Sequence, residues 1–92
     1  MTRSELVEKI AAKMPNLTLK EIDSIVDVVF AKMTEALSEG DRIEIRGFGA
    51  FSVHTRNPRI AINPKNKTQV AVPAKKMVHF KTGKELHKRL NA

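Results

Sequence analysis

Cationic side chains are the residues of this sequence with the clearest chemical potential, and they gather in its second half. Residues 1–41 carry five Lys and Arg against eight Asp and Glu, whereas residues 42–92 carry twelve against two. The whole chain has a formal charge of +7. Clustered Lys and Arg bind polyanions through Coulomb attraction and hydrogen bonds to phosphate oxygens. The sequence therefore predicts a polyanion-binding surface in residues 42–92.

Residues 56–76, RNPRIAINPKNKTQVAVPAKK, combine this charge with a period of two. Ile60 and Ile62 alternate with other residues on the way out, and Val70 and Val72 do so on the way back, as in two β-strands. We predict a protruding β-arm with an apolar side on each limb. Duplex DNA suits such an arm because it is anionic outside and apolar inside. The alternative is a solvated, partly disordered basic loop.

The turn of this arm is expected across residues 63–67. Asn63 and Asn66 tolerate unusual backbone angles, and Pro64 fixes its own φ and offers no N–H donor. Pro73 on the return limb cannot donate to a ladder, so it predicts an edge position or a bulge.

Catalytic and metal-binding patterns are missing. The serines lack a nucleophile-elbow context, and the acidic residues fall at positions typical of helix surfaces. His54, His79 and His87 lie far apart in the sequence without metal-ligand spacing. The chain has no cysteine, which excludes a disulfide framework and a thiolate metal site and suits a reducing cytosol. We expect no enzyme activity, no cofactor, no metal and no small-molecule substrate.

A chain of 92 residues predicts one domain with a small core of its own. Folding of so short a chain buries only about 60% of its unfolded surface. Four Phe without Trp or Tyr make the core thinner still. The sequence shows no signal peptide and no apolar run of about 18 residues, so nothing in it indicates export or a membrane span. A second subunit is therefore expected to complete the core.

Two N-terminal helices are expected, each opened by a Thr-x-x-Glu capping box, at residues 2–5 and 18–21. The first should end near residue 14 and the second near residue 38, before Gly40. At 100° per residue, the apolar residues of the second helix cover roughly 140°, wider than the minimum core stripe. This helix is expected to contact both a sheet and a second subunit. The arc contains Ile22, Ile25, Val26, Val29, Phe30, Met33, Ala36 and Leu37.

From residue 42 the period changes to two, which predicts a half-buried strand with Ile43 and Ile45 on its inner face. Gly47-Phe48-Gly49 should form a tight turn, with both glycines taking angles that other residues resist. A return strand over residues 50–55 and a third strand ending at Phe80 complete a three-stranded sheet. A third capping box at residues 82–85 should open a short last helix.

Several of these motifs together resemble the HU/integration host factor family of bacterial DNA-bending proteins. The resemblance covers essentially the whole chain. Residues 42–46 and 79–86 are most similar to the β-type subunits of that family. The motifs that carry it are Gly47-Phe48-Gly49-Ala50-Phe51, Arg56, Arg59, Asn63-Pro64 and Phe80-Lys81-Thr82-Gly83-Lys84-Glu85-Leu86.

The resemblance implies an α+β fold with two N-terminal helices, a three-stranded antiparallel sheet, a long protruding β-arm and a short C-terminal helix, assembled as an intertwined dimer. Its implied partners are double-stranded DNA and either a second copy or a related α-type subunit. Two arms would embrace DNA through the minor groove, and a proline would wedge between base pairs. The implied setting is the bacterial nucleoid in the cytoplasm, with architectural roles in recombination, replication and transcription.

The same resemblance divides the single domain 1–92 into parts. Residues 1–40 would form the dimerisation part, 41–55 with 77–82 the sheet body, 56–76 the DNA-binding arm, and 83–91 the C-terminal helix.

The site residues follow from the resemblance position by position, with Pro64 as the intercalating proline. The sequence departs from the family pattern in two ways: Ile62 replaces the usual Arg before Asn-Pro, and Asn66-Lys67 replaces a Thr-Gly turn. The implied arm contacts are Arg56, Arg59, Ile62, Asn63, Pro64, Lys65, Lys67, Lys75 and Lys76. The implied body and clamp contacts are Arg42, Glu44, Arg46, Gly47, Lys81, Gly83 and Lys84.

Two alternatives remain at this point. The row Arg42, Glu44 and Arg46 is either a solvated strand face or, as the resemblance implies, a surface that selects A/T-rich flanking DNA through its groove shape. The basic half also suits an RNA- or ribosome-associated structural protein. Against that alternative, the sequence lacks the paired surface aromatic residues that stack unpaired bases.

Overall fold

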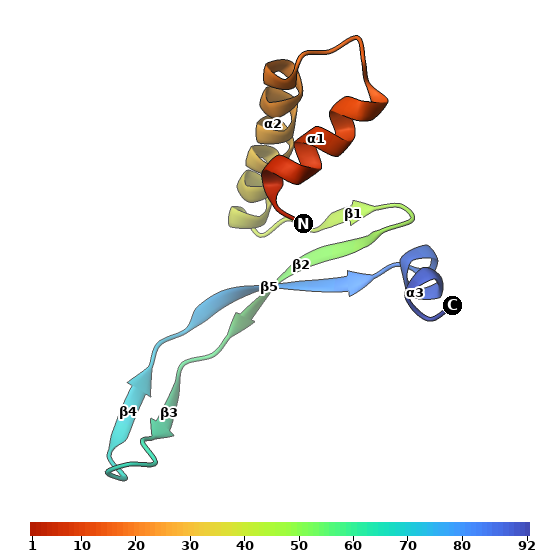
Figure 1. Cartoon of the computed structure of the whole chain (residues 1–92). Coiled ribbons are helices and arrows are strands. Elements are labelled where there is room, and N and C mark those ends of the chain that lie inside the picture. The colour runs from red at the N-terminus through yellow and green to blue at the C-terminus, as the bar shows by residue number, and fades with distance from the viewer. The chain divides into compact units, whose positions relative to one another are not determined.

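The computed structural model describes all 92 residues, Met1–Ala92. The chain divides into two compact units, Met1–Glu35 and Ala36–Ala92. The element types and their order confirm the expected α+β fold (Figure 1). The elements are α1 (Arg3–Lys13), α2 (Leu19–Ser38), β1 (Ile43–Ile45), β2 (Gly49–Arg56), β3 (Arg59–Ile62), β4 (Gln69–Val72), β5 (Lys75–Thr82) and α3 (Lys84–Leu90).

Both N-terminal helices begin at their predicted capping boxes. The Glu21 backbone N–H donates to Thr18 Oγ1 at 3.1 Å, and the Thr18 N–H donates to Glu21 Oε1 at 3.2 Å. At the start of α1, the Glu5 N–H donates to Thr2 Oγ1 at 3.2 Å. These bonds satisfy donors that a helix start otherwise leaves free. Neither helix is long and apolar enough to cross a membrane.

The buried core of the helical unit is small, as the composition predicts. Val7, Ile22 and Val26 are its buried hydrophobic residues, and only Ile22 is fully buried. Beside this core, Arg3 on α1 forms ion pairs with Asp23 at 2.6 Å and Asp27 at 2.5 Å on α2. The hydrogen bond to Asp23 is the main cause that raises the pKa of Arg3 above its ordinary value. Apolar packing and this exposed pair together hold α1 against α2.

The sheet of the second unit has the strand order β1-β2-β5 and is antiparallel throughout. Directly opposed residues share a face of the sheet. Phe51 lies opposite both Ile43 and Phe80, which defines the apolar face. The Phe80 ring packs 4.7 Å from Phe51 and 5.2 Å from Phe48, measured between ring centroids. Three of the four phenylalanines therefore form one aromatic cluster on the apolar side.

The two glycines of the first hairpin serve different purposes, which corrects the expectation that both need unusual angles. Gly47 has a φ of +83°, a left-handed conformation that side chains resist. Gly49 has no such angle, but a Cβ there would lie 2.5 Å from both the Lys81 carbonyl oxygen and Phe80 Cζ. Gly49 is needed because β5 approaches it too closely for any side chain.

The prediction of a third capping box at residues 82–85 is wrong. Thr82 is the last residue of β5 and pairs with Gly49, so its backbone belongs to the ladder. The N-cap of α3 is Gly83, which has no side chain to form a capping bond. The Thr-x-x-Glu pattern placed the cap one residue too early because the strand continues up to the helix.

The arm is a two-stranded ribbon, β3 paired with β4, that follows on from β2 and β5 (Figure 1). Arg56 pairs with Lys75 in one ladder and Arg59 with Val72 in the next. Two residues on each limb separate the two ladders. Neither limb therefore carries the extra residue that defines a β-bulge. Pro58 and Pro73 lie in this gap and lack the N–H that a ladder needs. Pro73 therefore marks a break in the pairing of an edge strand rather than a bulge.

The turn at the tip of the arm is held by side chains of asparagine. The Asn63 N–H donates to the Thr68 carbonyl at 2.9 Å, and the Lys67 N–H donates to the Asn63 carbonyl at 2.7 Å. Asn63 Oδ1 accepts from the Lys65 N–H and Asn66 Oδ1 from the Thr68 N–H. Lys67, with a φ of +56°, takes the left-handed conformation that was expected of the asparagines. The asparagines instead stabilise the turn through hydrogen bonds.

We predict that Gly49→Ala lowers the free energy of unfolding by about 3 kcal/mol, the upper end of overpacking effects, because its methyl group meets a backbone carbonyl and an aromatic ring. Gly47→Ala is the matched control. Its Cβ would lie in open space, so only the left-handed φ opposes it, at about 1 kcal/mol. Urea denaturation at equal protein concentration measures both. Equal losses would contradict the steric explanation.

Candidate nucleic-acid interface

The polar face of the sheet gathers the predicted body residues into one row. Glu44 lies opposite Ala50, and Ala50 lies opposite Lys81, so the row crosses all three strands. Arg42 and Arg46 are two residues either side of Glu44 and share its side because strand side chains alternate. The register therefore separates these charges from the phenylalanines on the opposite face.

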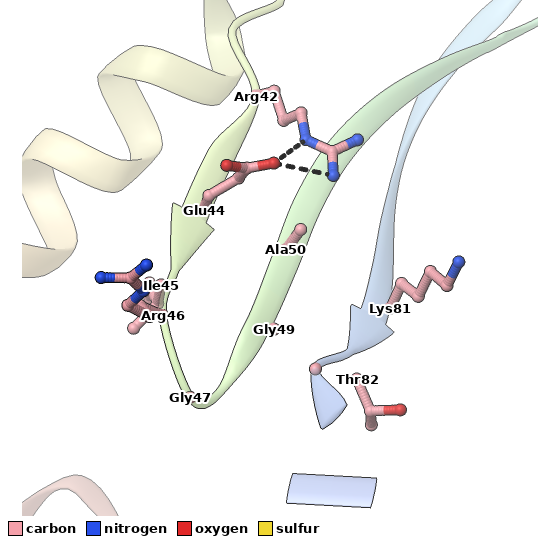
Figure 2. A pocket seen from close by; sticks show the side chains of 10 residues that line it. Arg42, Glu44, Ile45, Arg46, Gly47, Gly49, Ala50, Lys81 and Thr82 are labelled. Atoms are coloured by element: carbon pink, nitrogen blue, oxygen red, sulfur yellow. Dashed lines mark hydrogen bonds and ion pairs between the residues drawn. The ribbon is translucent and has the colours of Figure 1, made fainter. Parts of the chain in front are cut away.

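An open hollow of about 460 Å³ lies along this row. Figure 2 shows its lining, which comes from the β1–β2 hairpin and the end of β5. The structure thus brings together six of the seven predicted body and clamp residues, and the seventh, Lys84, follows directly as the first residue of α3. The six are Arg42, Glu44, Arg46, Gly47, Lys81 and Gly83.

The charges in this hollow are unequally compensated. Arg42 donates from Nε and Nη2 to Glu44 Oε1 at 3.1 and 3.0 Å, as the dashed lines in Figure 2 show. Arg46 and Lys81 make no ion pair, and Lys81 extends from β5 away from the hairpin in Figure 2. Glu44 therefore neutralises Arg42 and leaves Arg46 and Lys81 as free cations for an anionic partner.

Gly83 is placed by packing against the hairpin. Its N–H donates to the Phe48 carbonyl oxygen at 2.8 Å, so this amide is already paired within the chain. A Cβ on Gly83 would lie 3.3 Å from that same oxygen. The unpaired donors of the helix start belong to the first turn of α3, which begins at Lys84.

The structure brings two histidines together that are far apart in the sequence. The rings of His54 on β2 and His79 on β5 lie 5.1 Å apart, and Ser52 Oγ lies 3.2 Å from His54 Nε2. Ser52 pairs with His79, so these side chains share the polar face. Only the strand register could reveal this pair. No group of three or more potential ligands gathers anywhere in the chain to hold a metal ion.

The arm carries its predicted cations at its root and at its tip. Arg56, Arg59 and Lys75 line a second hollow of about 380 Å³ where the prolines interrupt the ladder. Lys76 pairs with Thr55 and so lies on the other side of the β2–β5 ladder from Lys75.

At the tip, the predicted contacts occupy or adjoin the turn. Pro64 is exposed within the turn, and Lys65 and Lys67 are exposed on either side of Asn66. Ile62 ends β3 directly before Asn63 and pairs with Gln69. Its exposed fraction of 66% is high for an isoleucine.

Curated relatives match the chain over its full length. The family model described as "Bacterial DNA-binding protein" matches residues 1–91. The integration host factor subunit beta of Hahella chejuensis is 52% identical over 92 residues, which is 100% of this chain and 94% of that protein. The subunit of the same name from Cupriavidus metallidurans is 52% identical over 91 residues, 99% of this chain and 67% of that protein.

Solved structures of HU proteins share the fold. A cocrystal of Anabaena HU with DNA aligns with a TM-score of 0.86 at 31% identity, covering 98% of this chain and 97% of that one. HU from Thermotoga maritima aligns with a TM-score of 0.67 at 27% identity, covering 98% of each chain. By family model, sequence identity and fold, this chain belongs to the HU/integration host factor family of bacterial DNA-binding proteins.

Proposed function

We propose that this protein acts as a dimer that binds duplex DNA through the minor groove and bends it by inserting Pro64 between base pairs. The observation that carries the proposal is the tip of the arm. Pro64 is exposed in a turn fixed by hydrogen bonds at both ends, with cationic side chains beside it. A rigid apolar wedge at the end of a basic ribbon suits a stack of base pairs between two rows of phosphates.

Phosphate binding is assigned to the free cations of the body and arm. Arg46 and Lys81 lack acidic partners, and Arg56, Arg59 and Lys75 line the hollow at the root of the arm. Lys84 lies at the start of α3, where the helix dipole also favours an anion. The HU relative crystallised with DNA supports a nucleic-acid partner for this surface.

Dimerisation is assigned to residues 1–40, the sheet body to 41–55 with 77–82, DNA contacts to the arm 56–76, and residues 83–91 to the C-terminal helix. The partner is a second copy or a related α-type subunit, since the curated relatives are named as beta subunits. We place the protein in the bacterial nucleoid, with architectural roles in recombination, replication and transcription and without a catalytic activity of its own. An RNA or ribosome partner is the alternative, which competition between RNA and DNA duplexes of equal length tests.

We predict that the chain is an obligate dimer. Ile25, Val29 and Phe30 on α2 are about half exposed, at 51%, 49% and 49%, although the apolar arc predicts that they are covered. The buried core holds only three side chains, too few to offset the conformational entropy of folding. Sedimentation should give a dimer, with a melting temperature that rises with protein concentration. A folded monomer at micromolar concentration would refute this assignment.

Two substitutions in the polar row are expected to change the affinity for DNA in opposite directions. Arg46→Ala removes a free cation and should weaken binding, with the larger loss on A/T-rich flanks. Glu44→Ala releases Arg42 from its ion pair and adds a positive charge to the face. Its affinity for random DNA should rise by severalfold at low salt, while its preference for A/T-rich flanks falls. Binding isotherms on matched A/T-rich and random duplexes measure both effects. Equal changes in affinity on the A/T-rich and random duplexes, for both variants, would assign the row to a solvated face.

Pro64→Ala should weaken bending more than binding. The substitution keeps every positive charge, so log K should fall with log salt by about 0.9 per neutralised phosphate in both proteins. Without the rigid wedge, unstacking a base step is no longer compensated. Energy transfer between the ends of a duplex of about 35 base pairs, a few helical turns long, should show a larger end-to-end distance in the variant complex. If that distance equals the wild-type value, Pro64 is only a turn residue.

A further inference from the structure

The two outward-facing isoleucines of the arm form a ridge of their own, which we call the isoleucine ridge (Ile60 and Ile62). The β3–β4 register places Ile60 opposite Ala71 and Ile62 opposite Gln69, so these four residues share one face. Ile60 and Ile62 are 69% and 66% exposed. The ladder residues of this face carry no charge, and the ridge lies directly before the turn that contains Pro64.

The opposite face of the same ladder is different. Ala61 pairs with Val70, and Arg59 pairs with Val72. Ala61 and Val72 are partly buried, and Val70 is 47% exposed. The larger apolar side chains therefore stand on the more exposed face, which is the reverse of what a free-standing ribbon in water favours.

The charges around the isoleucine ridge indicate which kind of partner it can bind. The arm around it is cationic, with Lys65 and Lys67 at the tip and Arg56, Arg59 and Lys75 at the root. A partner must therefore present negative charge on both sides of an apolar or weakly polar strip. The minor groove of duplex DNA has this arrangement, with phosphates along both edges and the base edges as its floor.

The floor of the minor groove differs between base pairs in a single group. A·T and T·A pairs show only acceptor atoms there, whereas G·C adds the N2 amino donor of guanine. An isoleucine pressed onto that floor cannot accept a hydrogen bond, so it would strip water from the guanine amino group without replacing it. A buried donor left unpaired is strongly unfavourable. Gln69, the one polar side chain on this face, can both donate and accept, so it tolerates either pair.

We propose that the isoleucine ridge makes the arm select against G·C pairs in the minor groove, through exclusion of the guanine N2 amino group. This inference rests on the proposed function and adds a specificity determinant to it. The selection is direct and occurs under the arm, so it is separate from the groove-shape selection assigned above to Arg46 and Glu44.

The test compares the double variant Ile60→Thr/Ile62→Thr with Val70→Thr as its matched control. Threonine keeps the β-branch that strands favour and supplies an oxygen that can accept from the amino group. Val70 lies on the opposite face of the same ladder, so its substitution makes a similar change in polarity away from the ridge. All three side chains are substantially exposed, so far-UV circular dichroism and melting temperature should match wild type.

Each protein is titrated at fixed salt with three duplexes of mixed sequence, composed throughout of A·T, G·C or inosine·C pairs. Inosine·C lacks the N2 amino group but keeps the major-groove pattern of G·C. Wild type should bind the A·T and inosine·C duplexes about tenfold more tightly than G·C, since one unpaired donor has an effect of this order. The double variant should reduce this ratio to about twofold or less, whereas Val70→Thr should preserve it.

Three outcomes would overturn the inference. In the first, the double variant keeps the wild-type ratio of affinities between the A·T and G·C duplexes. The preference then comes from groove width, which affects wild type and variants equally. In the second, Val70→Thr loses as much selectivity as the double variant. In the third, the double variant abolishes a self-association of the protein while the ratio stays constant, which makes the ridge a protein contact. If wild type binds all three duplexes equally with a steep salt dependence, only this inference fails. If it binds none of them, the proposed function fails.

Discussion

The close approach of β5 to Gly49 sets the register on which the rest of the second unit depends. The Lys81 carbonyl and the Phe80 ring occupy the space that a side chain at position 49 would need. A slip of one residue would move every side chain of a strand to the other face of the sheet. The phenylalanine cluster would then leave the apolar face, and the row of Arg42, Glu44 and Lys81 would be lost.

The same register leads without a shift into the arm, although prolines interrupt the pairing. Because the numbers of residues are equal on the two limbs, β3 and β4 continue the alignment of β2 and β5. This alignment decides that Ile60 and Ile62 share one face and that Val70 and Val72 share the other. A single extra residue on one limb would have mixed the two sets. The division of the arm into an exposed isoleucine face and a more covered valine face is therefore a consequence of strand alignment.

The charge that the second unit presents depends on ion pairing between side chains as well as on the number of charged residues. The second half of the chain carries ten more positive than negative groups. Within the hollow, however, the ion pair between Arg42 and Glu44 removes one of these cations from direct competition for a partner. Arg46 and Lys81 are thus the unpaired cations of this hollow, and Glu44 controls how much positive charge the hollow presents.

Local sequence by itself determined the elements of this protein, because capping boxes, helical periodicity and strand alternation act over a few residues. It predicted both N-terminal helices, the three-stranded sheet, the arm and its turn, while the family motifs assigned Pro64 and the basic contacts, which remain proposals. Tertiary structure decided what depends on strand alignment. It brought His54 to His79, made Gly49 a packing residue, ended β5 at Thr82 where a cap was expected, and occupied the Gly83 amide. It also gave the left-handed turn position to Lys67 and set the isoleucines apart from the valines. These features join residues far apart in the chain or depend on how two strands pair, so no local pattern encodes them.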